Sequence, residues 1–222
     1  MSLQGVEDLL PTSDPDYRSI KNPLAVSAVT KKLYDQVYEH AKEGRCVLTL
    51  RGDHSIAIST IAGTAKAIRE RLGIEMAVIW VDAHTDINTP ETRESGNVHG
   101  MPVAFLSGLA KEDRQDVFGW LKKENLISLK KLVYIGLRDS WKMALGHIGN
   151  DTPIHLSFDV DTLDLIEGDF IAECVHESGC LVAMDLVEVN LTLEPGIDDI
   201  GGQQTVRSGC SLVRCALGES LL

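Results

Sequence analysis

The sequence predicts an α/β fold of three layers, in which a parallel β-sheet lies between two layers of helices. Apolar strand-like segments alternate with helical segments along the chain, which is typical of parallel sheets covered on both faces. No internal repeat or low-complexity linker interrupts the alternation. We therefore expect residues 1–222 to form one domain. Residues 1–20 are expected to form a loose N-terminal arm, because they contain Leu-Pro and Asp-Pro steps.

The predicted elements follow one another in a regular order. Residues 22–43 have helical periodicity, with Pro23 near the start and Gly44 after the end. The remaining predicted helices cover residues 56–72, 103–110, 141–149, 166–179 and 205–217. Buried strands are predicted at residues 45–50, 76–82, 131–137, 153–161 and 180–190. In such folds ligands bind at the carboxyl ends of the strands.

The composition is that of an ordinary globular protein, with 44% hydrophobic and 24% charged residues. A net charge of -12 disfavours nucleic acid and anionic membranes as partners and suits a site that holds cations. No apolar run reaches membrane-spanning length, and the first residues lack the layout of a secretory signal. The five cysteines include no C-x-x-C pair. We therefore expect a reduced, cytoplasmic protein.

Acidic and imidazole side chains gather where four of the predicted strands end. Alternate residues of an extended chain point to the same side, so neighbours two apart in these groups are expected to converge. Each group alone also has a structural interpretation, such as a helix N-cap, a solvated loop or an ion pair at a strand end. Their shared edge of the sheet favours a common site instead. The groups are Asp53 and His54, then Asp82, His84 and Asp86, then Asp159 and Asp161, and finally Glu188.

Six of these residues form a candidate metal-binding set of two imidazoles and four carboxylates. So acidic a set does not assemble without cations, and its oxygen-rich chemistry suits hard divalent ions such as Mn²⁺. Six ligands are more than one tetrahedral ion needs. Two ions that share bridging carboxylates would lower the pKa of a water between them. We therefore expect two Mn²⁺ per chain, held by His54, Asp82, His84, Asp86, Asp159 and Asp161.

Five motifs, in the order RGDHS, VDAHTDINTP, ESGNVHGMP, SFDVD and MDLVEVN, resemble those of the ureohydrolase family in its arginase-type, fungal form. The resemblance extends from about residue 22 over nearly the whole chain. It implies the three-layer fold shared with the deacetylases, and hydrolysis of the guanidinium group of L-arginine to L-ornithine and urea by a hydroxide between two manganese ions. It also implies a homo-oligomer, either a trimer or a hexamer.

The resemblance implies a role for each matching residue. One manganese would be bound by His54, Asp82, Asp86 and Asp159, and the other by Asp82, His84, Asp159 and Asp161, so that Asp82 and Asp159 bridge. Glu188 matches the residue that holds the substrate guanidinium, and His99 matches a proton shuttle. These two residues and Asp86 make up the implied catalytic set. The positions that match recognition of the substrate's α-carboxylate and α-amino groups are Asn88, Ser95 and Asn97.

The chain also departs from the family pattern. Arg51 stands where the family usually has glycine, and Arg93 lies within the substrate-recognition motif. Family segments are short or missing around residues 140–152 and 162–170, where loops wall the active site. Either those loops are absent from the sequence as it stands, or the chain itself is shortened. A shortened chain leaves two alternatives, a catalytically impaired binding or regulatory protein and a related ureohydrolase such as agmatinase. His155 and Asp185 are expected to be structural.

Overall fold

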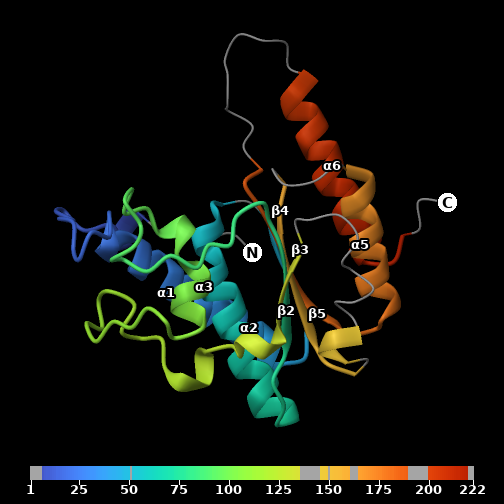
Figure 1. Cartoon of the computed structure of the whole chain (residues 1–222), viewed down its shortest axis with the longest axis horizontal. Helices are drawn as coiled ribbons and strands as arrows, with labels where there is room; N and C mark the ends of the chain where they lie inside the picture. The colour runs from blue at the N-terminus through green and yellow to red at the C-terminus, as the bar shows by residue number, and fades with distance from the viewer. Residues whose placement is uncertain are drawn as a thin grey trace.

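The computed structural model describes residues 7–50, 52–135, 146–149, 151–160, 165–189 and 200–219. Figure 1 shows one sheet between two layers of helices, with α1, α2 and α3 on one side and α5 and α6 on the other. The predicted three-layer α/β/α fold with a parallel sheet is therefore confirmed. Within the part of the chain that the structure describes, none of the helices combines the length and apolar surface that a membrane crossing requires.

The sheet has five strands in the order β1-β5-β4-β2-β3, and every pairing is parallel. All carboxyl ends therefore lie at one edge. Strand β1 was predicted to be buried, but among the described strands it lies at the edge of the sheet beside β5 and is half-buried, with Leu50 53% exposed. The strands are β1 (Val47–Leu50), β2 (Ala77–Val81), β3 (Leu132–Ile135), β4 (Ile154–Asp159) and β5 (Leu181–Val187).

The alternation of side chains along β2 explains its unbroken run of apolar residues. Ala77, Ile79 and Val81 pack in one hydrophobic cluster with residues of α5 and α6. Val78 and Trp80 pack in a second cluster, with residues of α1 and α2. Successive side chains of a strand point to opposite faces, so a strand covered on both faces needs apolar residues at every position.

The helices differ from their predicted bounds mainly at their ends. Helix α3 stops earlier than predicted. Helix α6 begins five residues before the predicted start, and the added residues 200–204 include two glycines, whose weak helix propensity explains why the prediction began later. Residues 146–148 form a helical turn, and the rest of the predicted helix 141–149 lies outside the described residues except Gly149. The α-helices are α1 (Pro23–Lys42), α2 (Ala57–Leu72), α3 (Pro102–Leu106), α5 (Leu165–Glu177) and α6 (Ile200–Ala216).

The described part of the N-terminal arm, residues 7–20, is attached to the body rather than loose. The carboxylate of Asp14 accepts hydrogen bonds from the backbone N–H groups of Leu24 (3.0 Å) and Ala25 (2.8 Å). These groups lie in the first turn of α1, where no intrahelical acceptor is available. Tyr17 and Ile20 form a short antiparallel bridge, and Ile20 is fully buried.

Candidate metal centre

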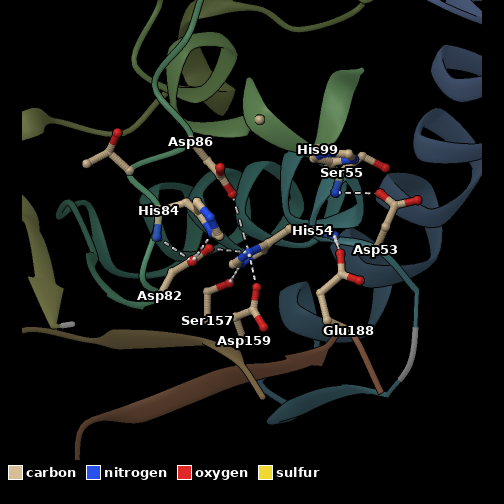
Figure 2. A network of polar contacts seen from close by, with 12 residues as sticks. Asp53, His54, Ser55, Asp82, His84, Asp86, His99, Ser157, Asp159 and Glu188 are labelled. Atoms are coloured by element: carbon tan, nitrogen blue, oxygen red, sulfur yellow. Dashed lines mark hydrogen bonds and ion pairs between the residues drawn. The ribbon is translucent and has the colours of Figure 1, made fainter. Parts of the chain in front are cut away.

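The turn after β1 places a histidine over the carboxyl edge of the sheet. Gly52 has φ +103°, a conformation that glycine adopts at little cost. Asp53 then accepts a hydrogen bond from the backbone N–H of Ser55 (2.8 Å) and so begins the short 3₁₀ helix His54–Ile56. The imidazole of His54 is consequently buried at the centre of the polar network in Figure 2.

Three buried carboxylates surround Nδ1 of His54. Oδ2 of Asp82 lies 2.8 Å from this nitrogen, Oδ2 of Asp86 lies at 3.5 Å and Oδ2 of Asp159 at 3.6 Å. They come from the loop after β2 and from the last residue of β4 (Figure 2). Candidate ligand atoms of His54, Asp82 and Asp159 all lie within 4.8 Å of one another. The structure therefore gathers one imidazole and three acids around a single point.

The charged groups of this site shift one another's pKa values. Burial disfavours the charged imidazole of His54, but the carboxylates of Asp159, Asp82 and Asp86 outweigh burial and raise the pKa of His54 to about 9. Burial, together with the charge of Asp82, raises the pKa of Asp86 to about 7, although His54 and His84 act against it. Burial also opposes ionisation of Asp82, yet His54 holds the pKa of Asp82 below its usual value.

These residues fit a divalent cation. The Nδ1 atom of His54 and the Oδ2 atom of Asp82 are buried 2.8 Å from each other, and apart from ion-pair contacts neither has a well-aligned hydrogen bond to any residue that the structure describes. Buried polar atoms are rarely left in this state unless an ion or water completes their contacts. Oxygen donors with one or two imidazoles suit hard divalent ions better than zinc of the structural kind.

One other predicted ligand, His84, stands apart from this group. The chain leaves its extended conformation after Val81, so the expected alternation of side chains does not reach His84. The imidazole of His84 is 76% exposed at the rim, with Nδ1 3.1 Å from Oδ1 of Asp82. Asp86 returns to the centre through a left-handed backbone conformation, φ +44°. Asp161 lies outside the described residues, as does Arg51.

Glu188 lies beside the turn that carries His54. Its backbone N–H donates to the carbonyl oxygen of Gly52 (3.0 Å), and its Oε1 accepts from the backbone N–H of His54 (3.1 Å). Glu188 has φ +59°, which is uncommon for a residue with a side chain and persists only where neighbouring contacts fix it. The carboxylate of Glu188 is thereby held next to the group of acids (Figure 2).

The loop from residue 88 to residue 100 gathers the other predicted site residues. Nδ2 of Asn88 donates to the carbonyl oxygen of Gly100 (3.3 Å). Oγ of Ser95 accepts from Nε of Arg93 (3.0 Å) and from the backbone N–H of Asn97 (3.4 Å). Nη2 of Arg93 lies 3.1 Å from Nε2 of His99. Among the described residues, no hydrogen bond or ion pair joins this set to His54 or the three aspartates.

Two residues near the centre were not among the predicted site residues. The indole of Trp80 stacks on the imidazole of His54, and Oγ of Ser157 lies 3.1 Å from Nε2 of His54. Each precedes a carboxylate by two positions in the chain, Trp80 before Asp82 and Ser157 before Asp159. The rule of alternating side chains that indicated the carboxylates therefore also indicates these two residues, but their types did not suggest metal chemistry.

A buried polar network lies beneath the site. Oδ2 of Asp185 accepts from Oγ1 of Thr60 (2.6 Å) and lies 2.9 Å from Nε2 of His155. Asp185 and His155 are both fully buried. These contacts tie α2 to the sheet, in agreement with the structural role predicted for His155 and Asp185.

Comparison with known proteins settles the family. The model of the arginase family matches residues 10–147, more than half of the chain. The chain belongs to the arginase family. It is similar to the arginase of Neurospora crassa, with 60% identity over 97% of this chain and 72% of that protein. It is also similar to the arginase of Coccidioides posadasii, with 57% identity over 97% of this chain and 80% of that protein.

Solved structures of the arginase family share the fold. The crystal structure of a cold-adapted arginase from the yeast Glaciozyma antarctica matches with a TM-score of 0.75 and 40% identity, covering 90% of this chain and 79% of that chain. The structure of arginase from Bacillus subtilis matches with a TM-score of 0.79 and 27% identity, covering 96% and 83%. The sheet and its two helix layers are thus those of the arginase family.

The chain is shorter than its arginase-family relatives inside the matched region. The alignment with the Neurospora crassa arginase runs over 260 positions, whereas the chain has 222 residues, so at least 38 aligned positions hold no residue of this chain. This shortfall agrees with both expectations, loops absent from the sequence as it stands and a chain that is itself shortened. The sequence predicts the shortfall around residues 140–152 and 162–170, parts of which lie outside the described residues.

Proposed function

We propose that this chain is a manganese-dependent hydrolase that converts L-arginine to L-ornithine and urea. The observation that carries the proposal is the convergence of three buried carboxylates on Nδ1 of His54, in a chain that belongs to the arginase family. The arginases of Neurospora crassa and Coccidioides posadasii, at 60% and 57% identity, support the same reaction for this chain.

The proposed cofactor is a pair of Mn²⁺ ions. His54, Asp82, Asp86 and Asp159 would hold one ion, and Asp82, His84, Asp159 and Asp161 would hold the other. The gathered oxygen donors and the buried Nδ1 of His54 support the first set. The contact between His84 and Asp82 supports the second set. When bound, divalent ions supply hydroxide near neutral pH, because they lower the pKa of water.

The protein's own side chains would bind and orient the substrate. A guanidinium is a planar cation with paired N–H donors, and a carboxylate such as Glu188 accepts two of them at once. The backbone contacts of Glu188 to Gly52 and His54 hold this carboxylate beside the metal ligands. Asn88, Ser95 and Asn97 would bind the α-carboxylate and α-amino groups. His99 would deliver the proton that the departing amine of ornithine requires.

A second candidate is a catalytically impaired member of the family that binds metal and ligand without turnover. The observation that favours it is the shortfall of at least 38 aligned positions. Altered walls could also change the preferred amine, as in an agmatinase. A single-domain chain, a trimeric or hexameric assembly and a cytoplasmic location remain predictions.

The test combines metal content and urea release on one preparation of the chain. About two Mn²⁺ per chain after loading, with urea formed from L-arginine, would support the proposal. The same metal content without urea would favour the impaired protein, and faster release of urea from agmatine would favour the related enzyme. A chain that binds no Mn²⁺ would overturn the assignment of the ligands.

A further inference from the structure

We propose that Trp80 and Ser157 are positioning residues that fix the plane and the tautomer of the His54 imidazole, so that Nδ1 faces the metal centre. The inference rests on the proposed function and deepens its metal site. It concerns two side chains that lie beneath the carboxylates and that contribute no candidate ligand atom of their own.

Trp80 and Ser157 form one layer of the sheet directly below the acids. Strands β2 and β4 are neighbours, and Trp80 is the register partner of Ser157. Asp159 follows Ser157 by two positions and is the last residue of β4, and Asp82 follows Trp80 by two positions, directly after the end of β2. Each strand thus contributes a residue that contacts the ring of His54 and, two residues on, a carboxylate that faces Nδ1 of the same ring.

Ser157 determines which nitrogen of His54 carries the proton. A histidine binds a metal through an unprotonated nitrogen, and a hydrogen bond at the other nitrogen fixes that tautomer. Nε2 of His54 lies 3.1 Å from Oγ of Ser157, and both residues are buried. Within the described part of the chain, this is the hydrogen-bond contact found at Nε2. With Nε2–H donating to Ser157, Nδ1 is the nitrogen left to bind a cation held among Asp82, Asp86 and Asp159.

Trp80 determines the plane of the ring. The centroids of its ring system and of the His54 imidazole are 4.1 Å apart, and the two planes differ by 8°. The indole is fully buried in the core, so it forms a rigid floor under the imidazole. Rotation of the His54 ring out of this plane would meet the indole. The electron-rich face of the indole also favours the partial positive charge that an imidazole gains on binding a cation.

The decisive experiment compares Ser157→Thr with Ser157→Val in the full chain. Both variants add nearly the same volume, but only threonine keeps a hydroxyl. The measurement is the dissociation constant for Mn²⁺, followed by electron paramagnetic resonance of the free ion during titration. We expect Ser157→Val to weaken Mn²⁺ binding about 10- to 100-fold relative to Ser157→Thr, which is typical when a ligand histidine loses its partner. Equal dissociation constants for the two variants would overturn the proposal.

Two further measurements keep the result interpretable. Ser59 is also fully buried and its hydroxyl has no hydrogen-bond partner among the described residues, so Ser59→Ala controls for loss of a buried hydroxyl elsewhere. If the larger side chains prevent folding, the dissociation constants for Mn²⁺ of Ser157→Ala and Ser59→Ala are compared instead. We then expect Ser157→Ala to bind Mn²⁺ about 10- to 100-fold more weakly than Ser59→Ala. For Trp80, Trp80→Phe should bind Mn²⁺ more tightly than Trp80→Leu, because it retains a flat ring. A wild-type chain that binds no Mn²⁺ would refute the proposed function itself, which is a different outcome from equal binding by the variants.

Discussion

The guanidinium of Arg93 lies against His99, with Nη2 3.1 Å from Nε2 of the imidazole. Its Nε donates to Oγ of Ser95, and its plane covers Gly100 so closely that a Cβ there would meet the guanidinium carbon at 2.4 Å. A guanidinium can only donate, so Nε2 of His99 must accept, and the ring is neutral in this arrangement. His99, which is proposed to donate a proton to the product, is thus in direct contact with the positive charge of Arg93.

Replacing Arg93 by glutamine should raise the pKa of His99. Burial, and then the charge of Arg93, lower the pKa of His99. The charges of His54 and His84 also lower it, and the charge of Asp53 raises it. Removal of Arg93 leaves burial as the main cause and makes the protonated ring easier to form. A neutral ring must gain a proton before it can donate one, so the pH range in which His99 is protonated should extend upward in Arg93→Gln.

The measurement is an NMR titration of His99 in the wild type, in Arg93→Gln and in Arg18→Gln. Arg18 is an exposed arginine paired with Glu91 and Glu112, so its removal controls for a general change of charge. An unchanged titration of His99 in Arg93→Gln would show that the contact with Arg93 does not set the protonation of this histidine.

Asp159→Ala should remove both manganese ions, because Asp159 is proposed to bridge them. Its Oδ2 is one of three carboxylate oxygens around Nδ1 of His54, and alanine offers no ligand atom in its place. We expect metal analysis to find much less than one Mn²⁺ per chain. Asp35→Ala is the matched control, since Asp35 lies in α1, where it makes an exposed ion pair with Lys31, and its loss should leave Mn²⁺ content unchanged. Two ions retained in Asp159→Ala would refute the bridging assignment.

Glu188→Gln should separate substrate binding from metal binding. Glutamine keeps an oxygen that can accept from the backbone N–H of His54, so the turn and the Mn²⁺ content should be preserved. The charge that pairs with the substrate guanidinium is lost, and hydrogen bonds to charged groups contribute about 1.5–3 kcal/mol. We expect kcat/KM for L-arginine to fall about 10- to 100-fold. Loss of Mn²⁺ from Glu188→Gln would instead show that Glu188 stabilises the metal centre.

The sequence predicted the sheet well because β2 and β4 are buried on both faces. Such strands need apolar residues at every position, so their limits and the carboxylates that follow them are visible in the sequence. The position of the His84 side chain could not be predicted in the same way. Alternation of side chains is a property of extended backbone, and the backbone turns after Val81, which leaves His84 exposed at the rim. The backbone turn at Glu188, with φ +59°, has no local sequence signal either.

Contacts between segments distant in sequence were the least predictable. Trp80 appeared to be an ordinary core residue, and its stacking on His54 becomes visible only when β2 and the turn after β1 meet in the fold. The start of α1 gives a similar lesson. Asn22 is the N-cap residue of α1, yet its side chain makes no capping hydrogen bond, and Asp14 provides the cap from eight residues earlier. Sequence rules for helix caps consider only adjacent residues and therefore miss such a cap.

The cap supplied by Asp14 leads to a stability prediction. Asp14→Ala removes the acceptor of two backbone N–H groups in the first turn of α1, those of Leu24 and Ala25. Loss of an N-cap typically costs about 0.5–2 kcal/mol, and the negative charge near the helix N-terminus is lost as well. We therefore expect the free energy of unfolding in urea to fall by about 1–2 kcal/mol at neutral pH.

Asp16→Ala is the matched control, because Asp16 is exposed and lies two residues away. Both variants should keep the wild-type Mn²⁺ content, since the cap lies outside the metal centre. An Asp14→Ala variant as stable as Asp16→Ala would mean that water replaces the carboxylate at no cost, and that the N-terminal arm contributes nothing to the stability of α1.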